Sequence, residues 1–499
     1  MPMDIVGEIA SHVFSLYGLF LVFTGVTVGV LGGALPGIST VMTVALVSTA
    51  TFTMEPLFAV LLLLSTQVGS TYGGSITATV LNIPGTPANA ATVLEAYPLM
   101  KKGQGPLALS INVISSFMGN TLGAIMLLIT MPFIVMIAMN FLSYEMFWFS
   151  LFGVVICAQL SKGDFVKGLI AGTVGIILGT VGIDPIHGAI RLNLGFGFLN
   201  AGISLIPAMV GLFGISEILN SIANDSIAPE KIYKDKLFYW KEWWPHKWLA
   251  LRVTLLGFLI GVLPGVGANV AAWIGYDHAK STSKNKEEFG TGRIEGLIGC
   301  ETATNAAAPG GVAPLLALGI PGDGNTAIVL GILLIHGVQP GPTFIANNPA
   351  WLYSIVITFL LAGVMFLFIG TFLGKWIIKC ISIPLPATMA VVTLLCIIGS
   401  FAYANRMSDV YLMFVFGIVG YLMSKTGFPV APLILGLILS GGMIDPFFRR
   451  GLLAARGDFT VFLTRPISAA LVALLLFVIY RGFVAPILNE RKQKKNAAQ

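Results

Sequence analysis

The chain has 499 residues, of which 56% are hydrophobic and only 10% are charged. Soluble domains carry roughly 25% charged residues, so this composition excludes a soluble globular protein and predicts a chain that crosses a membrane many times. The formal net charge of +6 does not indicate a nucleic-acid partner, because Lys and Arg in membrane proteins gather in cytoplasmic loops.

Long apolar runs predict the fold class. They are continuous rather than alternating, which favours helices over an outer-membrane barrel, and hydropathy predicts about 10–12 transmembrane helices. We therefore expect an all-α polytopic membrane protein in which some helices are broken or form re-entrant hairpins. The segment Met1–His12 contains no Lys or Arg, so it does not resemble a cleavable signal peptide. Four cysteines without CxxC spacing are expected to be small buried side chains, namely Cys157, Cys300, Cys380 and Cys396.

The first predicted helix break lies at Pro36-Gly37, which is followed by Ser39 and Thr40. Proline lacks a backbone N–H and glycine permits a sharp turn, so the helix is expected to stop and restart with a hydroxyl as its N-cap. A restarted helix offers free N–H groups and the positive end of its dipole. Inside a bilayer such backbone persists only where it is buried or lines a wet cavity. The alternative is a kink or an interfacial turn.

A second break at Pro84-Gly85 follows a segment rich in hydroxyl groups and glycine. The polar candidates on either side of it are Ser75, Thr77, Asn82, Thr86 and Asn89. These groups could hydrogen-bond the carboxylate oxygens of a substrate. Close helix packing is the competing explanation, because small residues let transmembrane helices approach each other.

The only long polar stretch covers residues 224–252 and interleaves five Lys and one Arg with four Trp. Trp prefers the membrane interface and Lys the cytoplasmic side, which predicts an interfacial cytoplasmic linker. We expect an N-terminal transmembrane repeat over residues 1–223, the linker over 224–252, a C-terminal repeat over 253–488 and a basic cytoplasmic tail over 489–499.

The second half repeats the Gly/Pro pattern of the first. The segment GGSITATVLNIPG, which begins at Gly73, returns as GGVAPLLALGIPG from Gly310, and GALPG at Gly33 returns as GVLPG at Gly261. Corresponding Gly/Pro-interrupted segments in two halves are typical of secondary transporters with a binding site near the middle of the membrane. The glycines and prolines of the second copy are Pro264, Gly265, Gly310, Gly311 and Gly322.

Polar residues gather around the second copy as well. They are Asn269, Glu301, Asn305, Asp323, Asn325 and Thr326. An ionisable residue within a span is a functional candidate, so Asp323 is expected to coordinate Na⁺ through its oxygens or, alternatively, to cap the restarted helix. Glu301 is either a ligand for a proton or cation or a residue at the membrane boundary.

The distribution of Lys and Arg indicates how the two halves are oriented in the membrane. Lys101 and Lys102 follow the first break, whereas the corresponding segment from His336 to Pro342 has no Lys or Arg. The positive-inside rule places the first segment in the cytoplasm and allows the second to lie outside. This predicts inverted halves. Residues 152–165 and 416–428 are also similar in sequence, although less closely, and they are followed by Asp184-Pro185 and Asp445-Pro446.

Enzyme motifs do not occur. The chain lacks GxxxxGK[ST], HExxH and GxSxG, which argues against nucleotide-driven pumping and against the corresponding hydrolases. His187 and His336 are isolated along the chain, and we expect loop or packing roles for them.

Four long motifs resemble the large membrane subunit of the tripartite tricarboxylate transporter family (TctA-like). They are GALPGIST from Gly33, the segment from Tyr72 to Leu109, GVLPGVGAN from Gly261, and the segment from Glu301 to Pro342. The resemblance covers nearly the whole chain. It implies a multi-pass permease of the bacterial inner membrane that imports a carboxylate and uses a cation gradient. It also implies two partners, a small membrane subunit and a periplasmic substrate-binding protein.

The expected function is therefore uptake of a di- or tricarboxylate coupled to Na⁺ or H⁺, without a resident cofactor. Transport of another small organic anion is the main alternative, and a membrane-embedded enzyme is a weaker one. The predicted substrate-binding residues are Ser39, Thr40, Ser75, Thr77, Asn82, Gly85, Thr86, Asn89, Asn269, Asn305, Gly310, Gly311, Gly322, Asn325 and Thr326. The predicted cation-coupling positions are Pro36, Gly37, Pro264, Gly265, Glu301 and Asp323, with possible Na⁺ near Asp323.

Overall fold

The computed structural model describes residues 3–35, 38–82, 84–160, 165–184, 188–222, 238–373 and 385–484. Several predictions fall outside these ranges. They concern Pro36, Gly37, His187, Cys380, the first part of the linker and the C-terminal tail. The described cysteines Cys157, Cys300 and Cys396 are buried, as expected.

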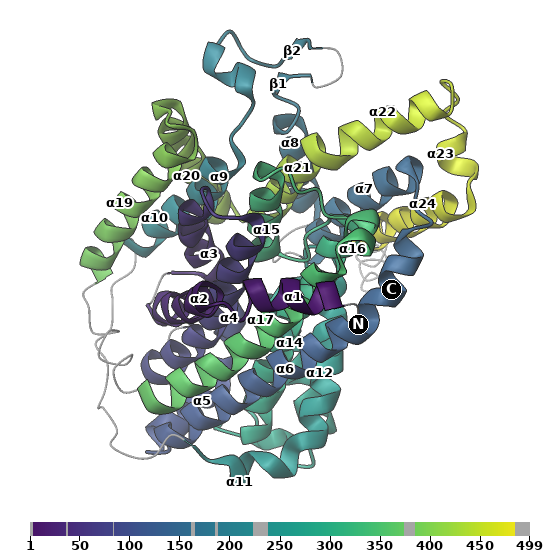
Figure 1. Cartoon of the computed structure of the whole chain (residues 1–499). Coiled ribbons are helices and arrows are strands. Elements are labelled where there is room, and N and C mark those ends of the chain that lie inside the picture. The colour runs from purple at the N-terminus through teal and green to yellow at the C-terminus, as the bar shows by residue number, and fades with distance from the viewer. Residues whose placement is uncertain are drawn as a thin grey trace, which may run out of the picture. The chain divides into compact units, whose positions relative to one another are not determined.

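Helices make up nearly all of the described chain (Figure 1). The first half contains α1 Met3–His12, α2 Leu16–Ala34, α3 Thr40–Ser48, α4 Pro56–Leu81, η2 Pro87–Asn89, α5 Ala90–Lys101, α6 Gly105–Ala138, α7 Ser143–Leu160, α8 Phe165–Leu178, α9 Leu205–Met209, η4 Val210–Ile215 and α10 Ser216–Ile222. The second contains α11 Trp240–Trp243, η5 Trp244–His246, α12 Lys247–Val262, α13 Gly267–Thr282, α14 Ile294–Leu318, α15 Gly324–Ile335, α16 Pro342–Asn347, α17 Pro349–Phe368, α19 Leu385–Ala404, α20 Met407–Thr426, α21 Val430–Leu439, α22 Asp445–Ala454, α23 Val461–Thr464 and α24 Pro466–Ile479. One short antiparallel hairpin pairs β1 Gly182–Ile183 with β2 Ile190–Arg191.

Seven helices in the described ranges are long and apolar enough to cross a membrane. They are Leu16–Ala34, Pro56–Leu81, Gly105–Ala138, Pro349–Phe372, Met407–Thr426, Val430–Ala454 and Pro466–Phe483. Several other apolar helices have only 10–17 residues, among them Gly324–Ile335, which restarts after the second-half break. The all-α class is confirmed, and the number of long helices is smaller than the predicted 10–12 spans because Gly/Pro breaks divide some apolar segments.

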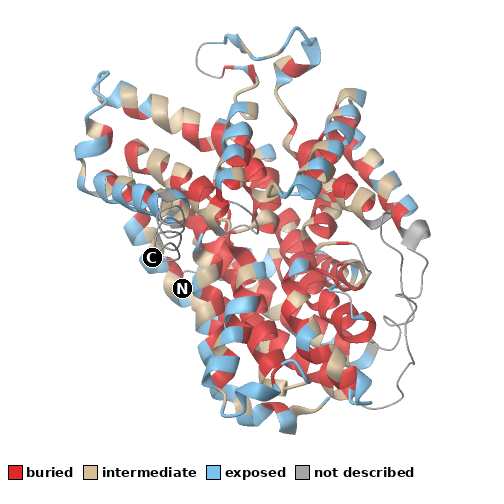
Figure 2. Ribbon diagram, turned by 180° about the vertical axis from the view of Figure 1, so that it is seen from behind, coloured by how far each residue is buried: buried red, intermediate tan, exposed pale blue. Residues whose placement is uncertain are grey.

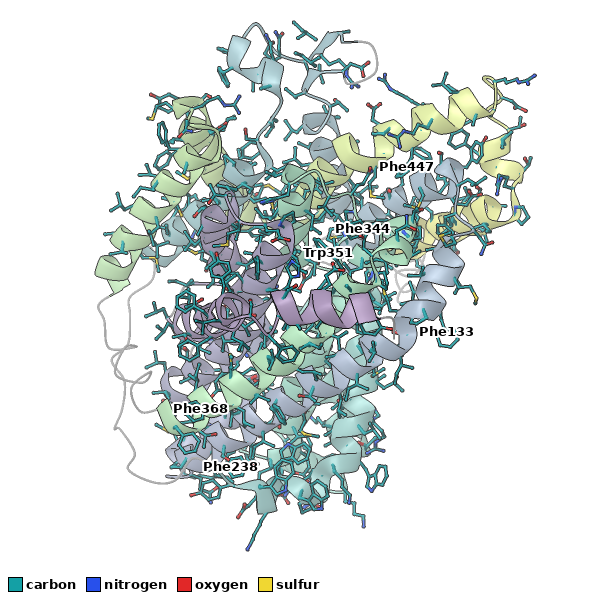
Figure 3. All side chains as sticks on the ribbon, viewed as in Figure 1. Phe133, Phe238, Phe344, Trp351, Phe368 and Phe447 are labelled. Carbon is teal, nitrogen blue, oxygen red and sulfur yellow. The ribbon has the colours of Figure 1, made fainter. Side chains whose placement is uncertain are left out.

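The exposed outer faces of the long helices are apolar. Phe133 of α6 and Phe368 of α17 are 62% and 55% exposed and point away from their helices (Figure 3). Side chains of this size stay exposed without cost where lipid replaces water. The buried positions lie on the inner helix faces, whereas exposed positions also gather at helix ends and loops (Figure 2).

The chain forms two compact units, and neither is a continuous segment. The first unit consists of Met1–Val135, Ile206–Leu263 and Gly267–Tyr421. The second consists of Met136–Leu205, Pro264–Val266 and Leu422–Gln499. Each unit therefore draws helices from both sequence halves.

The sequence repeat corresponds to a repeated backbone arrangement in the first unit. The N–H of Gly85 points to the carbonyl of Gly74 on α4 at 3.4 Å, and the N–H of Gly322 points to that of Gly311 on α14 at 3.3 Å. Each helix before the break ends on a left-handed residue, Asn82 with φ 61° and Gly319 with φ 70°. The Gly/Pro motif thus folds each chain segment back onto the helix that precedes it.

The helix that follows each break contacts the other copy within this unit, and α5 also packs against α4 of its own copy. α5, which follows the first break, packs against α13 and α14 of the second copy. α15, which follows the second break, packs against α3 and α4 of the first copy. The polar groups beside each break therefore meet residues of the other half.

Glycine forms the seam between α2 and α4, which lie side by side in Figure 1. A Cβ on Gly69 would approach the Cα of Val26 to 3.0 Å, and one on Gly73 would approach the backbone nitrogen of Ala34 to 3.0 Å. Only glycine lets the two backbones come this close, which explains why the hydroxyl- and glycine-rich segment of α4 stays helical despite its low helix propensity.

The second unit is built around α7, α8, α21, α22 and α24. α8 and α21 also approach through glycine, because a Cβ on Gly436 would meet the backbone nitrogen of Ile176 at 2.9 Å. In Figure 1 the β1–β2 hairpin lies beyond the end of α8.

The repeated Asp-Pro motif supplies an ion network in this unit. Asp184 accepts hydrogen bonds from Arg191 at 3.2 Å and from Arg449 at 2.8 Å. Asp445 accepts from the same two arginines at 3.2 and 2.8 Å. The two aspartates and two arginines therefore alternate, and Arg449 has a structural role that its position after Asp445 did not reveal.

Replacing Gly73 with Ala tests the α2–α4 seam. The new methyl group would meet the α2 backbone, so we expect a loss of about 1–3 kcal/mol, the usual cost of overpacking, seen as a lower thermal unfolding midpoint in detergent. Gly331→Ala on α15 is the matched control, because a Cβ there has no neighbour within 4 Å. The control should be neutral or stabilising by up to about 1 kcal/mol. Equal midpoints for both variants would contradict the close seam.

Candidate functional site

A buried carboxylate, that of Glu301, lies at the contact between the two copies in the first unit. Glu301 belongs to α14 and is 0% exposed. Its position in the first copy is taken by Leu64, since each stands nine residues before the Gly-Gly pair that begins at Gly73 or Gly310. The helix scaffold is duplicated here, but only the second copy carries an acid.

Four polar side chains from the first copy donate to this carboxylate. Ser75 of α4 and Ser116 of α6 donate to Oε2 at 2.7 and 2.9 Å. Thr92 of α5 donates to Oε1, and the amide of Asn89 lies 3.4 Å from the same atom. Both oxygens are thus hydrogen-bonded by neutral groups that come from three different helices and the turn before α5.

The Glu301 carboxylate has no ion-pair partner among the described residues. Burial of an unpaired charge is costly, and the usual solutions are hydrogen bonds, a bound cation or a proton. The hydrogen bonds and the nearby first turn of α5, with its positive dipole end, stabilise the ionised form. Uptake of H⁺ or a small cation would neutralise it. This is the chemistry expected of a coupling residue.

Asn89 connects this cluster to the first break. Its amide nitrogen donates to Ser75 at 3.0 Å, and its carbonyl oxygen accepts from the hydroxyl of Thr86. A side chain at Gly74 would occupy the space of the Asn89 amide. The Gly-Gly pair, the break and the buried acid therefore form one connected set of contacts.

The second break is organised by Asp323. Its Oδ1 accepts from the backbone N–H and the hydroxyl of Thr326, both at 2.8 Å, while Thr326 accepts from the backbone N–H of Asp323 at 2.9 Å. This is a reciprocal capping box at the start of α15. Of the two predicted roles for Asp323, helix capping is the one that these contacts describe.

Asp323 also lies beside the start of α13. A Cβ on Gly267, the first residue of α13, would lie 2.7 Å from the Cβ of Asp323, and Gly267 has a φ of +59°. Asn325 donates to Asp323 Oδ2 at 3.1 Å, and its own carbonyl oxygen is buried without a partner among the described residues. The second break therefore carries a negative charge and a free acceptor, which suits a cation better than an anion.

The remaining predicted residues divide into buried and accessible groups. Thr77 donates to the carbonyl of Ala34 at 2.8 Å, and Asn305 donates to the carbonyl of Glu301 at 3.0 Å, so both are internally satisfied. Ser39 caps α3 by accepting from Met42 at 3.2 Å and is half-buried. Thr40, Gly85, Gly310, Gly311 and Gly322 are buried, Gly265 is half-buried, Pro264 is buried, and Asn82 and Asn269 are exposed.

Sequence reasoning missed several members of the cluster. Thr92 and Ser116 donate to Glu301, yet neither stands beside a Gly/Pro break. A second buried acid, Glu95 of α5, was also missed. It accepts from Tyr276 at 2.8 Å and from the backbone N–H groups of Gly290 and Gly292 at 2.6 and 2.7 Å. An acid inside an otherwise apolar segment was the available signal for Glu95.

Glu95 of α5 and Glu301 of α14 differ in their surroundings. The carboxylate of Glu95 is held by a tyrosine hydroxyl and by backbone N–H groups of the loop between α13 and α14, including that of Arg293 at 2.7 Å. Such a fixed set of donors indicates a structural acid that ties α5 to this loop. Among the described residues, no three His, Cys, Asp or Glu side chains converge as a metal site.

Glu95→Gln tests the structural assignment. The amide nitrogen of Gln is a donor and would replace one of the two oxygens that accept from backbone N–H groups. At least one buried N–H would then lack an acceptor, at a cost of about 1–3 kcal/mol. We expect faster hydrogen exchange and proteolysis of residues 283–293. The matched control is Glu288→Gln in the same loop, whose carboxylate is exposed and, in the described part of the chain, pairs with Arg293 alone. Unchanged exchange in Glu95→Gln would contradict the role.

Comparison with known proteins agrees with this architecture. The model of the family described as "Tripartite tricarboxylate transporter TctA family" matches residues 19–435 of this chain. An uncharacterised 52.8 kDa protein in the TAR-I ttuC′ 3′ region of Agrobacterium vitis is 33% identical over 94% of both chains. A second Agrobacterium vitis protein, in the TAR-II ttuC′ 3′ region, is 37% identical over 48% of this chain and 98% of its own length. No solved structure matches. The chain therefore belongs to the tripartite tricarboxylate transporter TctA family, as a multi-pass membrane component of a bacterial transporter and not as an enzyme.

Proposed function

We propose that this chain is the permease of a tripartite system that imports a di- or tricarboxylate across the bacterial inner membrane, driven by a Na⁺ or H⁺ gradient. Family membership supports the transporter class and implies a system of three components. In this proposal a periplasmic binding protein delivers the substrate and a small membrane subunit completes the complex.

The observation that carries the proposal is the paired backbone breaks with unequal side chains. Gly85 and Gly322 fold back in the same way on Gly74 and Gly311. Thr86 and Asn89 then stand where the second copy has Asp323 and Thr326. A pseudo-symmetric frame with an asymmetric set of charges suits a carrier that binds an anion and a cation together.

We assign the coupling role to Glu301 rather than to Asp323. Glu301 is buried among neutral donors from several helices, so a change in its charge alters the contact between the two copies. Asp323 already serves as the N-cap of α15 through Thr326. The uptake of H⁺ or Na⁺ at Glu301 would release or reorganise its hydroxyl donors. The contacts between the two copies would then differ between the ion-bound and ion-free states, which is what conformational coupling requires.

The substrate carboxylates are proposed to bind at the first-half helix starts. The start of α3 offers the half-buried Ser39 and N–H groups at the positive end of the helix. It lies beside the second break, because a Cβ on Gly324 would approach the side chain of Val41 in α3 to 3.1 Å, so a cation held near Asp323 would also offset the charge of an anion bound there. Asn82, exposed at the first break, is a further polar candidate in the same sequence copy. Inverted halves and re-entrant hairpins remain part of this proposal, with motion of one unit against another giving alternating access.

Glu301→Gln is expected to uncouple transport. In proteoliposomes with both partner subunits, accumulation driven by an imposed Na⁺ or pH gradient should fall at least about tenfold, because an amide cannot gain a charge-neutralising ion. Exchange of labelled for unlabelled substrate without a gradient should persist. The probe is whichever di- or tricarboxylate most stabilises the cognate binding protein against heat.

Asp323→Asn is the control for that experiment. Asn is nearly as good an N-cap as Asp, so this variant should keep both its fold and its response to the gradient. Normal gradient-driven accumulation by Glu301→Gln, or loss of gradient response in Asp323→Asn alone, would reverse the assignment of the two acids.

Bulky substitutions at Gly85 and Gly322 test the repeated backbone arrangement at the two breaks. A Cβ on Gly85 would lie 2.6 Å from the Cα of Gly74, and one on Gly322 would lie 2.5 Å from the Cα of Gly311. Gly85→Val and Gly322→Val should abolish both accumulation and exchange, with a lower unfolding midpoint. Gly341→Val, in a connection where a Cβ has no neighbour within 4 Å, is the matched control, because Gly85, Gly322 and Gly341 all lie outside the left-handed region of backbone conformation. Wild-type uptake by both break variants would refute the proposed frame.

A further inference from the structure

A basic cleft lies in the first unit where α12 begins and α13 ends, away from the breaks and from Glu301. It has a volume of about 390 Å³. His246, Trp248, Arg252, Lys284, Arg293 and Glu295 are among its lining residues. Neither the transport proposal nor the family description assigns this cleft a ligand.

The cleft has an excess of positive charge. Arg252 and Lys284 have no ion pair among the described residues. Arg293 pairs with Glu288 and Glu295 at 2.9 and 2.7 Å, but its Nε–H is buried without a partner in the described part of the chain. The lining thus holds three permanent cations and one carboxylate.

His246 adds a neutral donor or acceptor rather than a fourth charge. Burial lowers the pKa of His246 below its ordinary value, while the charge of Glu295 raises this pKa and the Arg293 guanidinium lowers it. The fixed charges of the cleft are therefore those of Arg252, Lys284 and Arg293 and of the Glu295 carboxylate, with the cations in excess.

Aromatic side chains anchor the chain beside the cleft. Trp243 is fully buried and donates to Ser115 at 2.9 Å, and Trp240 stacks on it with a ring separation of 5.3 Å. Lys247 lies 4.6 Å from the ring centre of Trp244. Phe238, beside α11 in Figure 3, is 50% exposed. A set of Trp and Lys of this kind is typical of the membrane–water interface.

An apolar stripe on α12 continues from the cleft. Trp248, which lines the cleft, is 67% exposed, and Leu251, Leu255 and Leu259 are 47%, 49% and 52% exposed. Their spacing of three or four residues places them on one helix face. A molecule with an anionic head and an apolar tail would therefore find both of its binding surfaces side by side.

We propose that the cleft binds the phosphate head of an anionic phospholipid while its acyl chains lie along the α12 stripe. Arginine and lysine supply the donors that phosphate oxygens accept. The basic C-terminal segment of residues 489–499 is not a suitable occupant, because its Arg and Lys would be repelled. A free phosphate has the same head chemistry but makes no use of the stripe.

Native mass spectrometry of the full chain, stripped of lipid in detergent, tests this site with phosphatidylglycerol and phosphatidylcholine as probes. We expect the wild type to prefer phosphatidylglycerol at least about tenfold. Arg252→Gln with Lys284→Gln should weaken phosphatidylglycerol binding about 25-fold, which is about 1 kcal/mol per cation. Binding of phosphatidylcholine should not change.

The matched control removes two other exposed arginines, Arg450 and Arg481, by substitution with Gln. It should leave phosphatidylglycerol affinity within about twofold. If the double variant of the cleft does not fold, the single variants Arg252→Gln and Arg252→Lys separate charge from structure, because only Arg252→Lys should retain binding.

Two outcomes would overturn the proposal. One is equal phosphatidylglycerol binding by the wild type and the cleft variants. The other is stabilisation of the wild type by inorganic phosphate alone to the same extent as by phosphatidylglycerol, together with no effect of Leu255→Asn. That result would assign the cleft to a soluble phosphate, whereas weaker lipid binding by Leu255→Asn supports the lipid.

Discussion

A chain that leaves the helix inside a membrane must bring its freed backbone groups to partners within the protein, because lipid offers none. Here the partner at each break is the helix just completed. Gly85 returns to Gly74, and Gly322 returns to Gly311. This approach requires a glycine after each proline, since a Cβ on Gly85 would lie 2.6 Å from the Cα of Gly74 and a Cβ on Gly322 would lie 2.5 Å from the Cα of Gly311. The rest of the first unit is arranged around these two glycine contacts.

Contacts between each restarted helix and the other copy bring polar residues of both copies together. α5 packs on the second copy and α15 on the first, so each restarted helix carries its polar start to the other half. Glu301 meets Thr92 of α5 for this reason, alongside donors from α4 and α6. Asp323 performs the corresponding task for α15 by capping it directly. Both restarted helices consequently have an acid near their positive ends, which leaves fewer helix starts for an anionic substrate.

Two acids occur in the second copy where the first copy has uncharged residues, so the repeated backbone carries unequal charges. Leu64 is buried where the second copy has Glu301, and neutral Thr86 stands where it has Asp323. Negative charge therefore belongs to the second copy in both comparisons. An asymmetric carrier can hold a cation near these acids and an anion near the neutral half, which is consistent with the proposed symport. The basic cleft at α12 and α13 lies apart from this machinery and concerns the surrounding lipid instead.

Sequence by itself determined the membrane class, the repeat, the positions of the breaks and the candidacy of Glu301 and Asp323. Composition and local residue preferences act over short stretches, so they can be read without a fold. Only the tertiary structure decided that Asp323 caps a helix, that Thr92 and Ser116 join Ser75 and Asn89 around Glu301, and that Glu95 holds a loop. The Asp323 cap is local, reaching only Thr326, and there the structure decided between two roles that the sequence had allowed. The contacts of Glu301 and Glu95 join residues about 200 positions apart in the chain, and no local pattern specifies which distant helix will supply the partner of a buried charge.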